Sequence, residues 1–251
     1  MIDKGVFWTK ESPQMIAAFK EAQKTFKYFW RELYWESRRI IPALNFAFIK
    51  VGFHQDIPNQ GLVSEFMWVR VLSFDGFSII GVVDNEPQTL TNIKLGEEIT
   101  IPLEEVCDWI FSTQGKVYGG FTIQVLRTEM NDQDRQQHDN AWGLDFGTPG
   151  STLLAYQQEE KPENLIEHPM SINMKEKLKD FLAQYPNEMH QKDLNGYTML
   201  HKEAIAGNRS CIEVLLEKGA DSSAKTVQGH TALDFAKKLE WGHIVELLDR
   251  Q

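Results

Sequence analysis

Cysteine is scarce in this chain, which contains only Cys107 and Cys211 among its 251 residues. So few thiols exclude a disulfide framework, and we expect a reducing, cytoplasmic location. No stretch of about 18 consecutive apolar residues occurs, so no membrane-spanning helix is expected. The first residues also lack the charged-then-apolar layout of a secretory signal.

Recognisable catalytic and metal-binding motifs are absent as well. The sequence contains no glycine-rich phosphate loop and no CxxC pair. Its seven histidines show neither HxxxH nor HExxH spacing, which argues against a metal site. We therefore expect no cofactor, no metal and no enzymatic activity.

The charge is unevenly distributed along the chain, whose net charge is −10. Residues 128–174 contain 9 acidic and 2 basic residues, a net charge of −7. Such an acidic segment repels nucleic acid and attracts a basic protein. A solvated linker is the simpler interpretation of the same segment.

The last third of the chain repeats at an offset of 33 residues. Apolar residues recur in three rows, and the residues of a turn recur between them. A period of this length predicts stacked units that cannot bury their apolar faces alone. The three rows are Leu178, Cys211 and Ile244, then Phe181, Val214 and Leu247, then Leu182, Leu215 and Leu248.

The first part of the chain begins with a predicted helix from Ser12 to about Arg38, with Ser12 as N-cap and Pro13 at the first helical position. Apolar residues of this helix lie on more than one side, so we expect two surfaces to bury it. Alternating patterns then predict about five strands, joined largely by hairpins. The expected strands are 44–53, 65–72, 77–83, 96–101 and 117–126, with helical turns over 104–111.

This order of elements predicts an α+β domain with a long helix and a largely antiparallel sheet, followed by an all-α repeat domain. We place the α+β domain at residues 1–156, an acidic linker at 157–172 and the repeats at 173–251. The aromatic segment 141–150 is expected to pack on the first domain, because Trp142 and Phe146 are too apolar to leave in water.

The repeats resemble the ankyrin family. Gly196–His201 is similar to its opening turn, and Val214–Asp221 to its second helix and exit. Departures from the family occur at Met199, Glu203, Ala232 and Asp234. The resemblance implies that turn tips and first helices contact a protein partner. Carried over by position, it suggests Lys192, Asn195, Tyr197, Lys202, Lys225, Gln228 and His230, with Trp241 as a possible anchor and Phe235 in the core.

The first domain resembles the bacterial domain of unknown function typified by YegJ, over about residues 5–150. The residues that carry this resemblance are Glu65–Val69, Gly81, Asn85–Pro87, Lys94–Glu97, Asp108–Trp109 and Gly119–Thr122. It implies a small α+β fold and no established activity. Glu65 is a carboxylate inside a strand pattern, and we expect it on the wet face or paired with a base such as Arg70. We also include it among the candidate partner-binding residues.

Three hypotheses about function follow. The first is a non-enzymatic bacterial protein that binds and blocks a toxin, with a basic toxin as partner. The second is an enzyme whose site uses Glu65, Asp108 and His54, while the repeats recruit its substrate. The third is an intracellular scaffold. Neither nucleic acid nor membrane is expected as a partner.

Overall fold

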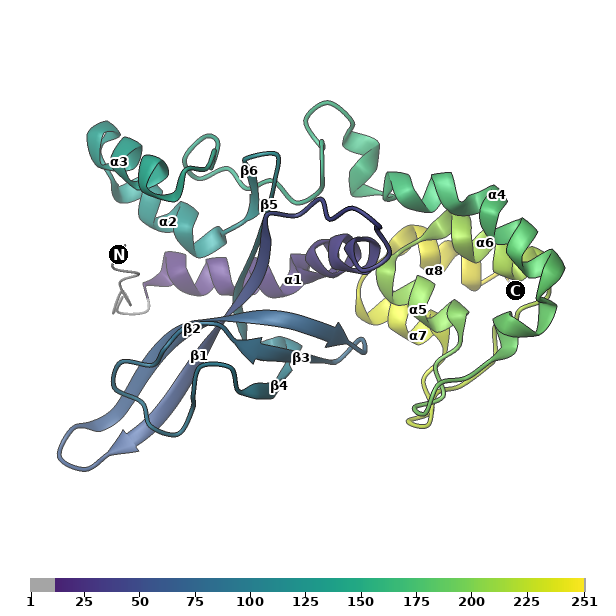
Figure 1. Ribbon diagram of the computed structural model, residues 1–251, viewed down its shortest axis with the longest axis horizontal. Coiled ribbons are helices and arrows are strands. Elements are labelled where there is room, and N and C mark those ends of the chain that lie inside the picture. The colour runs from purple at the N-terminus through teal and green to yellow at the C-terminus, as the bar shows by residue number, and fades with distance from the viewer. Residues whose placement is uncertain (1–11, 251) are drawn as a thin grey trace. The chain divides into compact units, whose positions relative to one another are not determined.

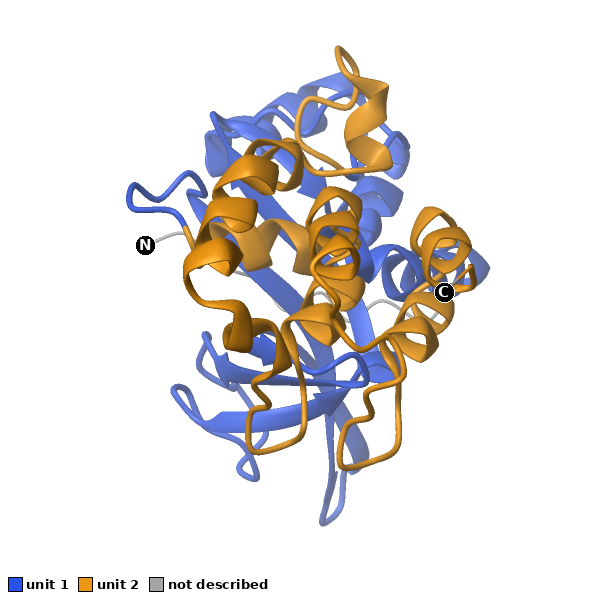
Figure 2. Cartoon of the chain, turned by 90° about the vertical axis from the view of Figure 1, so that its right-hand side faces the viewer, with its two compact units in different colours: residues 1–29, 39–154 blue, residues 30–38, 155–251 orange. Residues whose placement is uncertain are grey.

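The computed structural model describes residues 12–250, and the chain divides into two compact units (Figure 2). Unit 1 comprises Met1–Phe29 and Arg39–Leu154. Unit 2 comprises Trp30–Arg38 and Ala155–Gln251. The first helix, α1 (Pro13–Glu36), therefore contributes residues to both units.

Unit 1 contains one antiparallel sheet of six strands in the order β4-β3-β2-β1-β5-β6 (Figure 1). The two long strands at its centre form a hairpin, in which Phe53 lies opposite Glu65 and Lys50 opposite Trp68. The strands are β1 (Phe46–Ile57), β2 (Gly61–Phe74), β3 (Ser78–Val83), β4 (Glu98–Pro102), β5 (Val106–Thr113) and β6 (Lys116–Gly119).

The first part of α1 packs against this sheet through one face of the helix. Its buried side chains follow each other at steps of three or four residues: Met15, Ala18, Ala22, Phe26 and Phe29. The Trp109 indole N–H of β5 donates to the Ala22 carbonyl oxygen at 3.1 Å. The helix is thus fixed to the sheet by apolar packing and by a buried hydrogen bond.

The prediction of helical turns over Glu104–Phe111 is wrong. A short 3₁₀ turn, η1 (Leu103–Glu105), is followed directly by strand β5. In β5, Ile110 lies opposite Phe48 of β1 and Gly119 of β6. Pairing on both sides makes β5 an internal strand, and tertiary pairing overrides the weak local helical signal.

The strand expected over Val117–Leu126 is also wrong beyond Gly119. Strand β6 ends there, and helix α2 (Phe121–Glu129) begins after Gly120. Gly120 has φ 75°, a left-handed conformation that reverses the chain direction. The Asp108 carboxylate accepts the backbone N–H groups of Phe121 and Thr122 at 2.9 and 2.8 Å, which caps the new helix.

Helix α3 (Asp132–Trp142) lies in the acidic segment 128–174, where no helix was predicted. Asn131 caps its start by accepting the Asp134 N–H at 3.0 Å. Of the two aromatic residues of segment 141–150 that were expected to be buried, Phe146 is buried, whereas Trp142, the last residue of α3, is exposed. Residues 151–156, whose sequence is also compatible with a short strand, form none.

Unit 2 is helical, apart from its turns. A capping box at Thr198 begins the helix α5, and Gly219, with φ 91°, ends the second helix of that repeat as expected. Its helices are α4 (Pro169–Gln184), α5 (Met199–Ala206), α6 (Arg209–Glu217), α7 (Ala232–Lys238) and α8 (Gly242–Leu248), with 3₁₀ turns η2 (Pro162–Leu165) and η3 (Pro186–His190).

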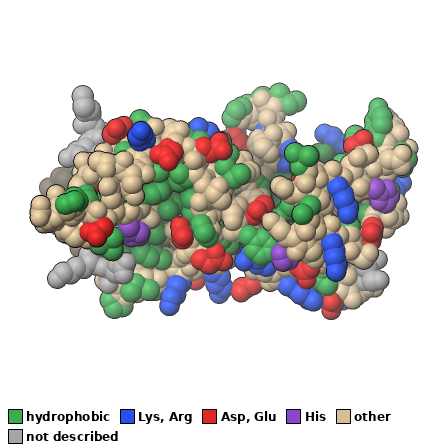
Figure 3. Space-filling view, turned by 90° about the horizontal axis from the view of Figure 1, so that it is seen from below, with side chains coloured by type: hydrophobic (Ala, Val, Ile, Leu, Met, Phe, Trp, Pro, Cys, Tyr) green, Lys and Arg blue, Asp and Glu red, His purple; other side chains and the backbone are tan. Residues whose placement is uncertain are grey.

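The two units together confirm the predicted fold class, an α+β domain with an antiparallel sheet followed by helical repeats. Between residues 12 and 250, no helix combines the length and hydropathy needed to cross a bilayer. On the face drawn in Figure 3, basic and acidic side chains lie close together with hydrophobic ones between them. The acidic side chains therefore do not gather into a single patch on that face.

Candidate functional site

The two turns that precede α5 and α7 are tied to each other. The Val227 N–H donates to the Asn195 carbonyl oxygen at 2.9 Å, and the Lys192 ammonium donates to the Lys225 carbonyl oxygen at 3.3 Å. A Cβ atom on Gly196, whose φ is 82°, would lie 2.9 Å from the Val227 nitrogen. Glycine therefore permits the close approach of the two turns.

His201 joins the turn of its own repeat to the turn of the next. Its Nδ1 atom accepts the Thr198 N–H at 3.0 Å, while Nε2 lies 3.1 Å from the Ala224 carbonyl oxygen. Nε2 must carry the proton in this arrangement, because Nδ1 already accepts a hydrogen bond. Burial lowers the pKa of His201, which favours the neutral ring that this geometry requires.

The second turn achieves the same capping with a different residue. Asp234 stands where the ankyrin pattern has histidine, and its carboxylate accepts the Thr231 N–H at 2.8 Å. The Asp234 N–H in return donates to the Thr231 hydroxyl at 3.2 Å. Hydrogen bonds from Thr231 lower the pKa of Asp234, so the cap is an anion.

Most residues suggested for partner contact lie on the surface of these turns and of the helices that follow them. Five are exposed and His230 is half-buried: the exposed ones are Lys192, Asn195, Lys202, Lys225 and Gln228. Lys202 forms an ion pair with Asp193 at 3.0 Å. The exposed residues stay candidates for partner binding.

Trp241 is only 2% exposed and has a structural role. Its indole N–H donates to the Ile205 carbonyl oxygen at 3.1 Å. Its ring covers Gly207 so closely that a Cβ atom there would lie 2.5 Å from it. Burial therefore removes Trp241 from the surface that a partner can touch.

Tyr197 is also buried, between the first helices of the two repeats. Its ring centroid lies 5.5 Å from that of Phe235 and 5.9 Å from that of His201. Phe235 is fully buried, in agreement with the core position expected for it. Tyr197 thus packs the stack and offers no accessible face to a partner.

Glu65 is 1% exposed and is neither on a wet face nor paired with Arg70. Its carboxylate accepts the backbone N–H groups of Gln88, Thr89 and Leu90 at 2.9, 2.5 and 3.2 Å. These bonds fix the loop after β3. Glu65 is therefore a structural residue and leaves the candidate surface.

Sequence reasoning missed the two most exposed apolar side chains of the turns. Leu194 is 100% exposed and Val227 is 78% exposed. They occupy equivalent positions, 33 residues apart, beside Asn195 and Gln228. The 33-residue offset could have predicted both residues. An apolar residue that recurs at the tip of the turn in both repeats lies away from the core.

The end of α1 supplies a buried polar network to unit 2. The Tyr34 hydroxyl donates to the Glu203 carboxylate, and the Asn208 side-chain amide donates to the same carboxylate at 2.7 Å. The Trp35 indole N–H donates to the Asn208 side-chain oxygen at 3.0 Å. Burial raises the pKa of both Glu203 and Tyr34. This network explains why Glu203 replaces the usual alanine of an ankyrin helix.

The residues considered for an enzyme do not form an acid–base pair. Glu65 lies opposite Phe53, whereas Asp108 lies opposite Lys50, so alternation along the strands places the two carboxylates on opposite faces of the sheet. His54 contacts the Ser64 hydroxyl at 2.6 Å. Each of the three side chains thus has a different set of neighbours.

The face that holds Asp108 also holds a lysine. The Lys50 ammonium lies 3.3 Å from the Thr122 hydroxyl, and burial lowers its pKa. Asp108 already accepts four hydrogen bonds, from Trp109, Phe121 and both donors of Thr122. This cluster serves the junction of β5 and α2. In the described part of the chain, no group of three or more His, Cys, Asp or Glu residues is placed to hold a metal ion.

Comparison with known families matches both parts of the chain. Residues 12–146 match the family described as "Uncharacterized protein conserved in bacteria (DUF2314)". Residues 170–249 match "Ankyrin repeats (3 copies)". Both resemblances inferred from sequence motifs are thereby confirmed.

Similar proteins match the whole chain or a part of it. The "Putative ankyrin repeat protein NMB1133/NMB1171" of Neisseria meningitidis serogroup B is 46% identical over 250 residues, which cover 99% of this chain and 98% of that protein. The "Uncharacterized protein YegJ" of Escherichia coli K12 is 35% identical over 63 residues, 25% of this chain and 41% of YegJ. The "Putative ankyrin repeat protein L81" of Acanthamoeba polyphaga mimivirus is 37% identical over 138 residues, 48% of this chain and 47% of that protein.

Proposed function

Because the chain belongs to the DUF2314 family of uncharacterised bacterial proteins and carries ankyrin repeats, we propose that it is a non-enzymatic binding protein that holds and blocks a toxin in the bacterial cytoplasm. The protein-interaction role is what ankyrin repeats indicate. The finer statement, that the partner is a toxin and that binding inhibits it, is our proposal. The chain has only two cysteines, which supports the cytoplasmic part of it.

The observation that carries this proposal is the pair of exposed apolar side chains at Leu194 and Val227. The free energy of the system falls when a partner removes exposed apolar groups from water, and this favours binding. The hydrogen bond from Val227 to Asn195 holds the two tips side by side, so one partner can cover both. Lys192 and Lys225 border them with polar donors, as a rim borders the apolar centre of an interface.

The mechanism of inhibition would be steric. A protein that covers both turns buries an area typical of stable complexes only if the neighbouring helices also take part. Such a bound surface blocks an active site without any chemistry by the inhibitor. The acidic segment 128–174 supports a basic partner, because opposite charge accelerates association.

Affinity capture with the full chain tests the proposal. We expect one stoichiometric protein partner, whose toxic activity falls when the chain binds. The double variant Leu194→Ser/Val227→Ser should recover much less of that partner. Ile172→Ser, which alters an exposed apolar side chain on α4, is the matched control and should retain it.

The outcomes separate the three hypotheses. A captured partner whose activity is unaffected indicates a scaffold. Chemical conversion of the captured partner by the chain indicates an enzyme whose repeats recruit its substrate. Equal recovery by the wild type and by the Leu194→Ser/Val227→Ser variant would refute the turn surface as the binding site.

A further inference from the structure

Helix α3 of unit 1 stands on the surface with none of its side chains buried. A surface helix of a globular protein ordinarily buries an apolar stripe. Here the attachment is polar, and it comes largely from one arginine of the preceding helix. Besides the packing of His138 and Trp142 on the ring of Phe146, polar contacts therefore set the position of α3.

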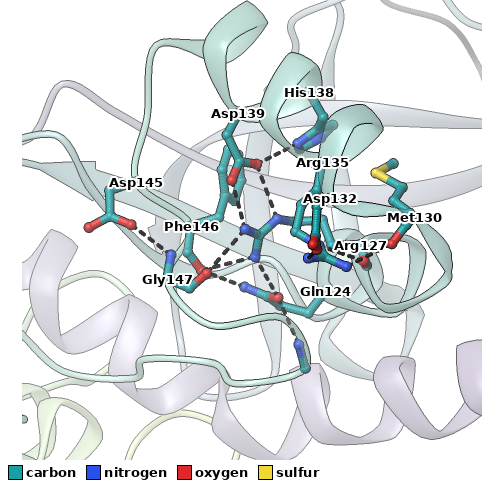
Figure 4. Close-up of polar contacts among 11 residues, drawn as sticks. Gln124, Arg127, Met130, Asp132, Arg135, His138, Asp139, Asp145, Phe146 and Gly147 are labelled. Carbon is teal, nitrogen blue, oxygen red and sulfur yellow. Dashed lines mark hydrogen bonds and ion pairs between the residues drawn. The ribbon is translucent and has the colours of Figure 1, made fainter.

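Arg127 of α2 provides that attachment (Figure 4). Its Nε and one terminal nitrogen donate to the Asp139 carboxylate at 3.1 and 2.7 Å. The remaining N–H groups donate to Gln124 at 2.9 Å, to the Phe146 carbonyl oxygen at 3.2 Å and to the Gly147 carbonyl oxygen at 3.1 Å. All five N–H groups of the guanidinium thus have partners, and they join α2, α3 and the loop after α3.

A second arginine fixes the start of α3. Arg135 donates to the backbone oxygens of Arg127 and Met130 at 3.2 and 2.7 Å. Burial disfavours the anion of Asp139, but hydrogen bonds from Arg127 and His138 outweigh it and lower its pKa. Asp139 therefore stays charged at neutral pH, and its ion pair with Arg127 holds α3 in one orientation.

This rigid support presents Trp142, which is 42% exposed, at the end of α3. Its ring centroid lies 6.0 Å from that of Phe146 and 6.3 Å from that of His138. Between residues 127 and 147 the chain has five acidic and two basic residues, a net charge of −3. Asp134 and Asp145 are exposed and lie on either side of Trp142 in the sequence.

We propose that the surface formed by α3 and Trp142 docks a basic, arginine-containing segment of a protein partner. Trp142 is exposed enough to stack with a guanidinium, and Asp134 of the same helix and Asp145 of the loop after it give this segment exposed carboxylates of the opposite charge. An exposed tryptophan on a pre-ordered support has the character of an interface anchor. This inference rests on the proposed function, since it adds a second contact surface for a protein partner, apart from the ankyrin turns.

Fluorescence anisotropy with the purified full chain tests the inference. The probe is a labelled peptide in which arginines alternate with leucine and serine, and the matched peptide carries glutamate at every arginine. We expect the basic peptide to bind in a salt-dependent way and the acidic peptide not to bind. Trp142→Ala should weaken binding about tenfold, whereas Trp142→Phe should keep most of it.

The double variant Asp134→Asn/Asp145→Asn should reduce the salt dependence of binding, and thermal unfolding checks that every variant is folded. The Leu194→Ser/Val227→Ser variant serves as a control and should bind the peptide as the wild type does. Equal binding of both peptides, or unchanged binding after Trp142→Ala, would overturn the inference. Failure of the proposed function would appear instead as the absence of a captured partner, which leaves the peptide titration unaffected.

Discussion

Two carboxylates of unit 1 show how a charged side chain in a strand can serve the backbone. Glu65 accepts three loop N–H groups, and Asp108 accepts two N–H groups of α2. Hydrogen bonds to an ionised acceptor are the stronger kind. Both residues therefore stabilise backbone segments, a role that their position in the sequence does not reveal.

Glu65→Ala should destabilise the chain by about 1–3 kcal/mol, because the N–H groups of Gln88, Thr89 and Leu90 lose their acceptor. Urea unfolding measures this change. Glu98→Ala, which alters an exposed carboxylate on β4, should change the stability by less than about 0.5 kcal/mol. Lost partner binding at unchanged stability would instead show that Glu65 is a contact residue.

His201 makes the repeat unit sensitive to acid. Its folded-state pKa lies below the ordinary value of about 6.5, so the unfolded chain takes up the proton first as the pH falls. The stability that neutral His201 contributes is fully present above about pH 6.5. It is lost progressively as the pH falls from there to the lowered pKa of the folded state. The melting temperature should fall less between about pH 7.5 and pH 5.5 in His201→Gln than in the wild type. His190→Gln alters an exposed histidine, and its melting temperature should fall as much as that of the wild type.

At the residue level, the sequence predicted what repeats in a fixed pattern. Thr198, His201 and Gly219 could be assigned because a helix start and a helix exit demand particular residue types. The burial of Trp241 and Tyr197 could not, because it depends on which neighbour fills the adjacent space. An exposed aromatic and a buried aromatic look the same in one sequence.

Among the elements, α1 is exceptional because its last turns lie in unit 2. Tyr34 and Trp35 contact Glu203 and Asn208, and the ring of Trp35 stacks on His168 at 5.9 Å. Arg31 is buried beside them and donates to the carbonyl oxygens of Leu165 and Ile166. Tyr34 and Trp35 also pack with Met170, Met174 and Leu178, so the first helix of the repeat region, α4, is supported by side chains of α1.

Trp35→Ala should therefore destabilise unit 2 by about 3–5 kcal/mol, and Tyr34→Phe by about 1–3 kcal/mol, since the second change only leaves Glu203 short of a donor. Hydrogen exchange of the α5 and α6 amides measures the effect where it arises. Ile40→Ala, at an exposed residue just beyond α1, is the control. If both variants leave the protection of α5 and α6 unchanged, the network contributes nothing to the unit.

Long elements with a clear period were predicted well, and short ones were not. Helix α1 followed from its pattern, as did most of β1 and β2, although these two strands extend to Ile57 and from Gly61, beyond the expected ends at 53 and 65. The apolar residues of 104–111 and 117–126 fit either a strand or a helix, and the choice came from tertiary pairing and from the cap that Asp108 provides. Helix α3 was missed because it lacks the apolar stripe by which surface helices are recognised.

For the whole molecule, the linear division into residues 1–156, 157–172 and 173–251 remains our prediction for the domains. The compact units differ from it, since unit 1 ends at Leu154, residues 157–172 belong to unit 2, and residues 30–38 group with 155–251. The repeats do indicate a need for support, because residues 175–185 align with a second helix only, and we expected the repeats to lean on the first domain, but no pattern indicates that residues 30–38 give that support. Only the three-dimensional structure reveals this pairing.

Cutting the chain tests this arrangement. A protease site inserted between Glu160 and Lys161 yields two fragments, and the N-terminal fragment carries residues 30–38. We expect the fragments to elute together in size-exclusion chromatography, because Tyr34 and Trp35 remain packed in unit 2. The cut Tyr34→Phe/Trp35→Ala variant should separate. Separation of the cut wild-type chain would contradict the arrangement.

The contribution of α1 to the repeats also limits how this gene can change by recombination. A cassette that encodes only the continuous C-terminal stretch would arrive in a new host protein without Tyr34 and Trp35, and so with Glu203 and Asn208 exposed at its opening end. Exchange between homologues should accordingly keep the first helix and the repeats as a co-inherited pair.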